Sequence, residues 1–366
     1  MDSYWEKLFK EPMVMVYCVF SKKIQKNIKM MSKILGKIRE KRMGYNLGRK
    51  ILSTPLIMNN KLYNYLYDKK ISKSINKLNK KYPFGVEIGT TNLCNAECIM
   101  CPHLKLKKMG TMDMGLYRKI IDNCERLGIK VITLSFFGEP FLDKELIEKI
   151  KYAKGKGMFV AFYSNASLLN EEWAKKIINS GLDGITISFD GYSKETYEKI
   201  RVGLKFEVVK KNILNLIETK KKMKKNNPQI ILVLVELEEN KKEIKQFYKE
   251  WNKKVDGINI INMRNWANKI KKEGTKESFH FNKNLKKKPC SLIWREMVVD
   301  WNGEVVLCND DWNHSNVLGN LKKQTIEEIW KGEKLNKIRK AHMKGEFSKI
   351  PLCSGCNRKS VWWLIN

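Results

Sequence analysis

From residue 82 onward, short apolar runs alternate with segments in which apolar residues recur at helical spacing. The apolar runs predict six strands, at Phe84–Gly89, Lys130–Ser135, Phe159–Tyr163, Gly184–Phe189, Ile230–Glu236 and Gly257–Asn262. The amphipathic segments predict helices near Met114–Leu127, Lys144–Lys154, Glu171–Ser180, Phe206–Lys222 and Lys241–Lys253. Because each parallel return between strands needs a crossover, the pattern predicts an α/β fold with a partial (β/α)6 TIM-like barrel.

The regions on either side of this barrel follow other patterns. Residues 1–81 predict a basic, helical N-terminal extension, and a polar linker ends the barrel near residue 270. Residues 285–366 predict a small C-terminal domain, so the expected domains are 1–81, 82–270 and 285–366. This last domain opens with a hairpin around Trp301-Asn302-Gly303, because Asn-Gly favours tight turns. A single helix around Thr325–His342 is expected to follow.

Composition narrows the range of functions. The chain has 366 residues, 43% of them hydrophobic, which is enough for a large core. Its net charge of +33 comes from lysines spread along the whole chain, and because no nucleic-acid-binding motif accompanies them we expect no nucleic-acid partner. The apolar run Met13–Phe20 is too short to span a bilayer and lacks a cleavage site, so we expect a cytoplasmic location.

The basic segment Ser21–Arg42 allows two interpretations. Its apolar residues recur at helical spacing, with lysines elsewhere on the helix. The helix either packs against the catalytic domain with a solvated basic face, or makes peripheral contact with an anionic membrane or an acidic partner. The sequence does not decide between them.

Three cysteines directly after the first predicted strand carry the chemistry. Cys94, Cys98 and Cys101 have the spacing Cys-x3-Cys-x2-Cys, with no fourth cysteine nearby. Three thiolates can hold three corners of a [4Fe–4S] cluster and leave one iron open, although a zinc site has the same ligand type. Ligands in such sheets bind at the carboxyl ends of the strands, which is where this loop begins.

A second cysteine group lies in the C-terminal region. Cys290, Cys308, Cys353 and Cys356 supply four thiolates, which can saturate an auxiliary [4Fe–4S] cluster for electron transfer or for structural support. The remaining cysteines, Cys18 and Cys124, stand in apolar or helical contexts where buried packing is the default.

The Cys-x3-Cys-x2-Cys loop on a predicted barrel resembles the radical S-adenosylmethionine (SAM) superfamily, over about residues 82–366. The resemblance implies that SAM chelates the open iron and that one electron cleaves SAM to a 5′-deoxyadenosyl radical. It also implies a flavodoxin- or ferredoxin-type reductant. The cysteine pattern of the C-terminal region resembles the twitch domain, the shorter form of the SPASM domain.

The resemblance also assigns SAM-binding residues to the loops after successive strands: Met100, Gly138, Glu139, Pro140, Ser164, Asn165, Ser188, Asp190 and Arg201. Phe137-Gly138-Glu139-Pro140 resembles the family's Gly-Gly-Glu-Pro motif, whose backbone and carboxylate accept hydrogen bonds from the SAM ammonium. Arg201 would contact the SAM carboxylate. Met100 stands where relatives often place an aromatic residue beside adenine. Taken singly, the two serines and Asn165 are equally compatible with strand-end caps.

The spacing of the auxiliary cysteines resembles radical SAM oxidoreductases of the 2-deoxy-scyllo-inosamine dehydrogenase type. That resemblance implies oxidation of a small polar substrate, such as a sugar, cyclitol or amino sugar, with the auxiliary cluster as electron acceptor. Arg264, after the sixth strand, is the candidate catalytic residue, and Trp266 a candidate pocket wall. The alternatives are a maturase of peptides or proteins, and a non-catalytic iron–sulfur protein that binds RNA or a membrane.

Overall fold

The computed structural model describes residues 81–267 and 289–356, with some residues between 69 and 78. The chain divides into two compact units, one of Met1–Lys81, His280–Ser291 and Lys359–Asn366, the other of Tyr82–Phe279 and Leu292–Arg358. All strands of the described residues belong to the second unit. The predictions for Met13–Phe20, Cys18, Ser21–Arg42 and the linker after residue 270 lie outside the described residues.

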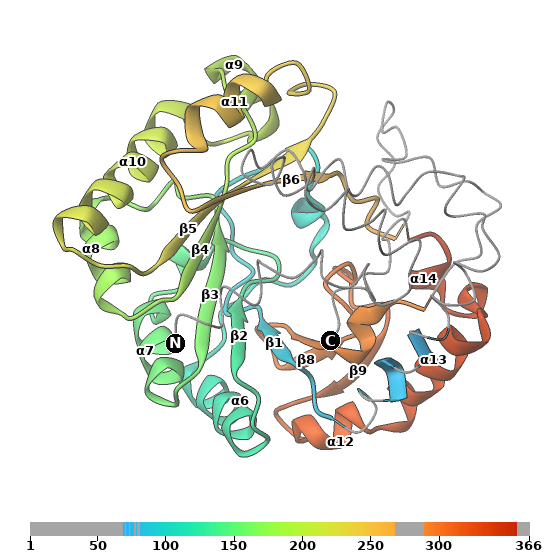
Figure 1. Ribbon diagram of the computed structural model, residues 1–366. Helices are drawn as coiled ribbons and strands as arrows, with labels where there is room; N and C mark the ends of the chain where they lie inside the picture. Colours follow the sequence, from blue (N-terminus) through green and yellow to red (C-terminus); the bar gives the residue numbers. More distant parts are fainter. Residues whose placement is uncertain are drawn as a thin grey trace, which may run out of the picture. The chain divides into compact units, whose positions relative to one another are not determined.

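The strands of this unit form one nine-stranded sheet in the order β6-β5-β4-β3-β2-β1-β7-β8-β9. Their bounds are β1 Gly85–Ile88, β2 Val131–Leu134, β3 Phe159–Ser164, β4 Gly184–Ser188, β5 Gln229–Glu236, β6 Gly257–Asn262, β7 Glu296–Val299, β8 Glu304–Val306 and β9 Val317–Asn320. Strands β1 to β6 are all parallel, which confirms the predicted α/β partial barrel. The sheet is strongly curved (Figure 1).

Helices cover the outer side of the curved sheet (Figure 1). The α-helices are α6 Met114–Arg126, α7 Leu146–Gly155, α8 Glu171–Asn179, α9 Lys194–Ile200, α10 Phe206–Lys222, α11 Ile244–Trp251, α12 Ile326–Trp330, α13 Glu333–Lys344 and α14 Pro351–Ser354. The 3-10 helices are η2 His103–Lys105, η3 Pro140–Leu142, η4 Ser291–Trp294 and η5 Phe347–Lys349. None of the helices in the described part of the chain has the length and apolar composition needed to cross a bilayer.

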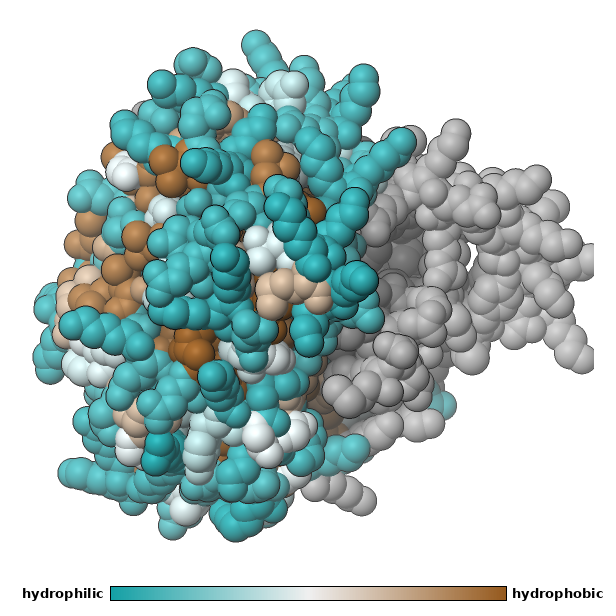
Figure 2. Space-filling view, turned by 90° about the vertical axis from the view of Figure 1, so that its left-hand side faces the viewer, coloured by the Kyte–Doolittle hydropathy of each residue, from teal (hydrophilic) through white to brown (hydrophobic). Residues whose placement is uncertain are grey.

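Side chains alternate between the two faces of each strand. One row, which includes Ile88, Leu134, Phe162 and Ile187, is fully buried and packs toward the helices. The opposite row faces the concave side of the sheet and mixes polar side chains such as Thr133 with apolar ones such as Phe159, and both are only partly buried. The outer, helix-covered surface is largely hydrophilic with scattered apolar residues (Figure 2).

The C-terminal hairpin differs from the expected separate domain in one respect. Strand β7 pairs in parallel with β1, from Gly85 opposite Glu296 to Ile88 opposite Val299, and so continues the barrel sheet. Its partner β8 is antiparallel, as the Asn302-Gly303 turn predicted. The expected boundary at residues 270–285 stays a prediction.

The prediction of one helix over Thr325–His342 is wrong. The segment forms α12 and α13, which are separated at Lys331 and Gly332. Thr325 starts α12 with a capping box to Glu328. Gly332 is extended at the N-terminus of α13, and a Cβ there would lie 2.8 Å from the Glu328 carbonyl oxygen. Helical periodicity alone does not reveal such a close approach.

Candidate functional site: two cysteine groups at the barrel mouth

The loop after β1 carries Cys94, Cys98 and Cys101, and backbone hydrogen bonds fix it from both sides. The amide of Glu97 donates to the Val202 carbonyl at 2.9 Å, and the amide of Ile99 donates to the Ile200 carbonyl at 3.1 Å. Thr91 bridges to Thr111 on the returning segment. These bonds hold an irregular loop in one conformation, because a buried backbone polar group without a partner is costly.

The three sulfur atoms suit an iron–sulfur cluster. Burial raises the pKa of Cys94 to about 11 and that of Cys101 to about 12, so both are thiols until a metal replaces the proton. Within residues 81–267 and 289–356, no three His, Cys, Asp or Glu side chains converge on one metal ion. A cluster distributes its cysteines over separate iron atoms, and three cysteine thiolates on one short loop are suited to hold three of its irons.

The Gly138-Glu139-Pro140 turn packs directly on this loop. Gly138 has φ +126°, and a Cβ there would lie 2.3 Å from the Thr91 carbonyl oxygen. Only glycine tolerates this conformation and this approach. The Glu139 amide then donates to the Leu93 carbonyl at 2.7 Å, one residue before Cys94. The motif thus contacts the backbone that leads into the cysteines.

Three of the predicted residues meet through the Glu139 carboxylate, which is fully buried. It accepts hydrogen bonds from the Ser164 hydroxyl and from the Asn165 amide, both at 2.7 Å. Burial raises the pKa of Glu139 to about 7, although these bonds and Arg201 oppose the rise. The Asn165 side chain donates to the Asn95 side-chain oxygen in the cysteine loop at 2.9 Å. These groups position one another, and their contacts to SAM stay predictions.

Asp190 and Arg201 form a buried ion pair. One Asp190 carboxylate oxygen accepts from Arg201 Nε at 2.5 Å, and the other accepts from the Val235 amide at 2.6 Å. Arg201 Nη1 lies 3.4 Å from Cys98 Sγ. Both Asp190 oxygens are therefore engaged within the protein, which gives Asp190 a positioning role that the strand-end pattern did not reveal. The contact between Arg201 and SAM stays a prediction.

The interior row of the strands holds one residue that the sequence predicted and two that it did not. Ser188, the predicted residue, is half-buried. Tyr163 lies in the same row and is 49% exposed at the end of β3. Glu87 in β1 also faces inward, and its carboxylate accepts from the Asn309 side chain at 3.2 Å. Strand alternation alone would have identified both residues as facing inward.

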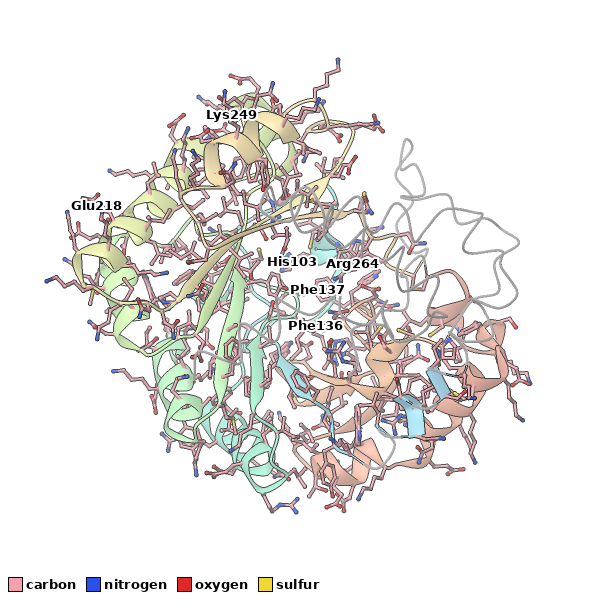
Figure 3. The ribbon with its side chains drawn as sticks, in the orientation of Figure 1. His103, Phe136, Phe137, Glu218, Lys249 and Arg264 are labelled. Atoms are coloured by element: carbon pink, nitrogen blue, oxygen red, sulfur yellow. The ribbon has the colours of Figure 1, made fainter. Side chains whose placement is uncertain are left out.

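Aromatic and cationic side chains gather where β6 ends (Figure 3). The Trp266 indole donates from Nε1 to the Met100 carbonyl at 2.7 Å, and its ring lies 5.4 Å from that of Phe137. The guanidinium of Arg264 lies 5.9 Å from the Trp266 ring. Met100 is itself buried, so its predicted place beside adenine is untested. The two residues singled out after the sixth strand therefore contact the cysteine loop or one another.

Arg264 also pairs with an aspartate in the loop that follows Cys308. Its Nη1 lies 3.1 Å from Asp310 Oδ1, and Asp310 Oδ2 lies 4.0 Å from Cys356 Sγ. The Asn265 side chain donates to the Gly355 carbonyl at 2.7 Å, between Cys353 and Cys356. Cys290 belongs to the other compact unit, and its inclusion in the ligand set stays a prediction.

His314 joins the β7–β8 hairpin to the loop that follows Cys308. Its Nε2 lies 3.0 Å from Asp300 Oδ2, and its Nδ1 lies 2.6 Å from Glu304 Oε2. The hydrogen bond to Asp300, reinforced by that to Glu304, raises the pKa of His314 to about 9 despite partial burial. At neutral pH a protonated imidazole therefore links two carboxylates.

This arrangement predicts a pH-dependent stability. Because the folded pKa of about 9 exceeds the unfolded value of about 6.5, protonated His314 stabilises the fold fully below about pH 6.5. The contribution declines as the pH rises through about 9. Denaturant unfolding of wild type and His314→Gln between pH 6 and 10 should show a stability difference that is largest at low pH. A difference independent of pH would contradict the doubly bonded imidazolium.

Comparison with known proteins agrees with these two cysteine groups. The family model "Radical SAM superfamily" matches residues 88–250, and "Iron-sulfur cluster-binding domain", the SPASM family, matches residues 290–357. An uncharacterised protein of Methanocaldococcus jannaschii is 35% identical over 112 residues, and the match spans 36% of that protein's length.

Proteins that match over more of this chain have a lower sequence identity to it. The S-adenosyl-L-methionine-dependent 2-deoxy-scyllo-inosamine dehydrogenase of Niallia circulans is 23% identical over 290 residues, which cover 75% of this chain and 93% of that protein. The solved structure of BtrN with AdoMet and 2-DOIA matches with a TM-score of 0.53 and 20% identity, over 77% of this chain and 96% of that one.

The peptide-bound structure of Streptococcus suis SuiB, in complex with precursor peptide SuiA, matches with a TM-score of 0.57 and 14% identity. This match covers 92% of this chain and 84% of that one. At such identities the structural matches establish the fold alone. The cofactors follow from the two matched domains: SAM with its [4Fe–4S] cluster, and auxiliary iron–sulfur. The chain is thus a radical SAM protein whose barrel is followed by a SPASM iron–sulfur domain.

Proposed function

We propose that this protein is a radical SAM dehydrogenase that oxidises a secondary alcohol of a small polar molecule, such as a sugar, cyclitol or amino sugar. The observation that carries the proposal is the connection between the two cysteine groups. Arg264 is 33% exposed in its side chain, pairs with Asp310 beside Cys356, and stacks near Trp266, which is bonded to the Met100 carbonyl. A substrate held there contacts groups from both cysteine loops.

The proposed ligand sets follow the two groups. Cys94, Cys98 and Cys101 hold the cluster that binds SAM, and Cys290, Cys308, Cys353 and Cys356 hold the auxiliary cluster. With SAM bound, the first cluster supplies a carbon-centred radical for hydrogen abstraction. A flavodoxin or ferredoxin supplies the electron that this step consumes.

The proposed oxidation removes a hydrogen atom, a proton and an electron from the alcohol. When SAM is bound, the radical derived from it would take a hydrogen atom from the carbinol carbon and become 5′-deoxyadenosine. The hydroxyl group would lose its proton to solvent. An auxiliary cluster held by Cys290, Cys308, Cys353 and Cys356 would accept the remaining electron, and the carbon–oxygen single bond would become the double bond of a ketone. In this sequence Arg264 orients the reacting oxygen, and Asp310 orients Arg264.

The residues proposed to surround SAM have two roles: some contact SAM, and others hold those residues in position. The Gly138 backbone, Ser188 and Arg201 face or border the interior and are proposed to contact SAM. Glu139 and Asp190 support them, because their carboxylates are taken up by neighbouring donors. Ser164, Asn165, Pro140 and Met100 shape the same wall.

A peptide or protein maturase is the second candidate. It is favoured by the extent of the match to the peptide-bound SuiB structure, which covers 92% of this chain. The two candidates differ in what they bind: the dehydrogenase turns over small alcohols without any peptide, and the maturase leaves them unchanged.

Loss of the auxiliary cluster should separate SAM cleavage from substrate oxidation. With 2-deoxy-scyllo-inosamine and related aminocyclitols as probes, the wild type should form 5′-deoxyadenosine and ketone in equal amounts. Cys308→Ala should still form 5′-deoxyadenosine, but its ketone should fall to background, as measured by mass spectrometry. Cys124→Ala is the matched control, because Cys124 is fully buried in α6 and is not a proposed ligand.

Two outcomes would overturn this function. Ketone formation by Cys308→Ala protein that lacks the auxiliary cluster would remove that cluster as electron acceptor. Turnover of a peptide, together with failure on every small alcohol, would establish the maturase.

Replacing Arg264 should affect the substrate without affecting the clusters. Loss of a charged hydrogen bond costs about 1.5–3 kcal/mol, so Arg264→Met should lower kcat/KM for the alcohol roughly 10- to 100-fold. Iron content and slow SAM cleavage without substrate should stay unchanged. Arg118→Met is the control, since Arg118 pairs with Glu148 on the outer helices. An unchanged kcat/KM in Arg264→Met would exclude Arg264 from the substrate site.

A further inference from the structure

A buried histidine contacts one of the auxiliary cysteines. His342 lies in α13 and is 1% exposed, and its Nε2 lies 3.4 Å from Cys353 Sγ. We propose that His342 donates its Nε2 hydrogen to the Cys353 thiolate and thereby raises the reduction potential of the auxiliary cluster. The inference depends on the auxiliary cluster and is independent of which substrate the enzyme oxidises.

The imidazole of His342 is held in place by its neighbours. Its ring packs edge-on against Phe347, with centroids 4.9 Å apart, and against Trp294, with centroids 6.3 Å apart. Phe347 lies in η5, directly after α13, and Trp294 lies in η4, before β7, so aromatic side chains from two different segments pack against the ring. A ring confined in this way keeps its Nε2 directed at the sulfur.

The helix itself is fixed by Arg339, one turn before His342. The buried guanidinium of Arg339 donates to the Ile293 carbonyl at 3.0 Å and to the Trp330 carbonyl at 2.9 Å. It also lies 4.4 Å from the Trp330 ring. These contacts tie α13 to the segment before β7 and to the end of α12. The distance between His342 and Cys353 is therefore set by the fold and not by a flexible side chain.

The chemistry of the pair determines the direction of the hydrogen bond. A cysteine that ligates iron is a thiolate, which accepts hydrogen bonds and cannot donate one. The facing imidazole nitrogen must then carry the hydrogen. Such a bond withdraws negative charge from the sulfur, and because reduction adds charge to the cluster, it favours the reduced state. A higher potential makes the cluster a better electron acceptor.

The test is the midpoint potential of the auxiliary cluster in the full-length holoenzyme, measured by EPR-monitored redox titration. SAM perturbs only the cluster with an open iron, so it distinguishes the two signals and makes that cluster an internal reference. His342→Phe removes the donor and retains a ring, and His342→Gln retains an N–H. Met343→Leu is the control, because Met343 lies on the same helix and is 46% exposed.

We expect His342→Phe to lower the equilibrium constant for one-electron reduction of the auxiliary cluster by up to about tenfold. This corresponds to a midpoint potential that is more negative by up to about 59 mV. His342→Gln should recover part of this shift. Met343→Leu and the SAM-binding cluster should keep their potentials. An unchanged auxiliary potential in His342→Phe protein with full iron content would overturn the proposal.

A measurement on the wild type keeps the proposal testable if His342→Phe does not fold. Pulsed EPR of protein labelled with 15N-histidine should show a weak nitrogen coupling, together with an exchangeable hydrogen near the reduced auxiliary cluster. A strong coupling typical of direct ligation would make His342 an iron ligand, and absence of any histidine coupling would exclude the hydrogen bond. Either result would contradict the proposal.

Discussion

The site depends on one constraint: an irregular loop must hold three sulfur atoms still while leaving one side open. The loop follows strand β1, and backbone carbonyls near the end of α9 and near Thr111 accept hydrogen bonds from its amides. Gly138 completes the support, since its missing side chain lets the next turn reach the Thr91 carbonyl. Rigidity is thus supplied by backbone contacts around the cysteines.

Buried charges reinforce the same loop. The Glu139 carboxylate binds the start of the segment after β3, and that segment reaches Asn95 in the cysteine loop. The Asp190–Arg201 pair brings a cation within hydrogen-bonding distance of Cys98. A buried ion pair contributes little net stability by itself, so its value here lies in orientation. On the opposite side, Trp266 and Arg264 connect this loop to the residues beside Cys356.

The elements that sequence patterns predicted best are those whose order is set locally. The six parallel strands appear within a residue or two of their predicted ends, and Phe206–Lys222 and Gly257–Asn262 match as predicted. The cysteine loop and the Gly138-Glu139-Pro140 turn could be identified from the sequence because the residues that define each motif lie close together in the chain. Features set by distant contacts were not predictable. The parallel pairing of β7 with β1, the pairing of Asp190 with Arg201 and the contact of His342 with Cys353 each join residues separated in sequence. The break at Gly332 was missed for another reason: it accompanies a close approach to the Glu328 carbonyl, which helical periodicity does not reveal.

The central claim is that Cys94, Cys98 and Cys101 hold an iron–sulfur cluster with one iron free to bind SAM. The most direct test is EPR spectroscopy of the reduced, anaerobically reconstituted protein before and after addition of SAM, with Mössbauer analysis of the same samples. Direct binding of SAM to iron predicts a changed cluster signal and one iron site with altered parameters. An unaltered spectrum, or zinc as the metal held by the three cysteines, would contradict this account.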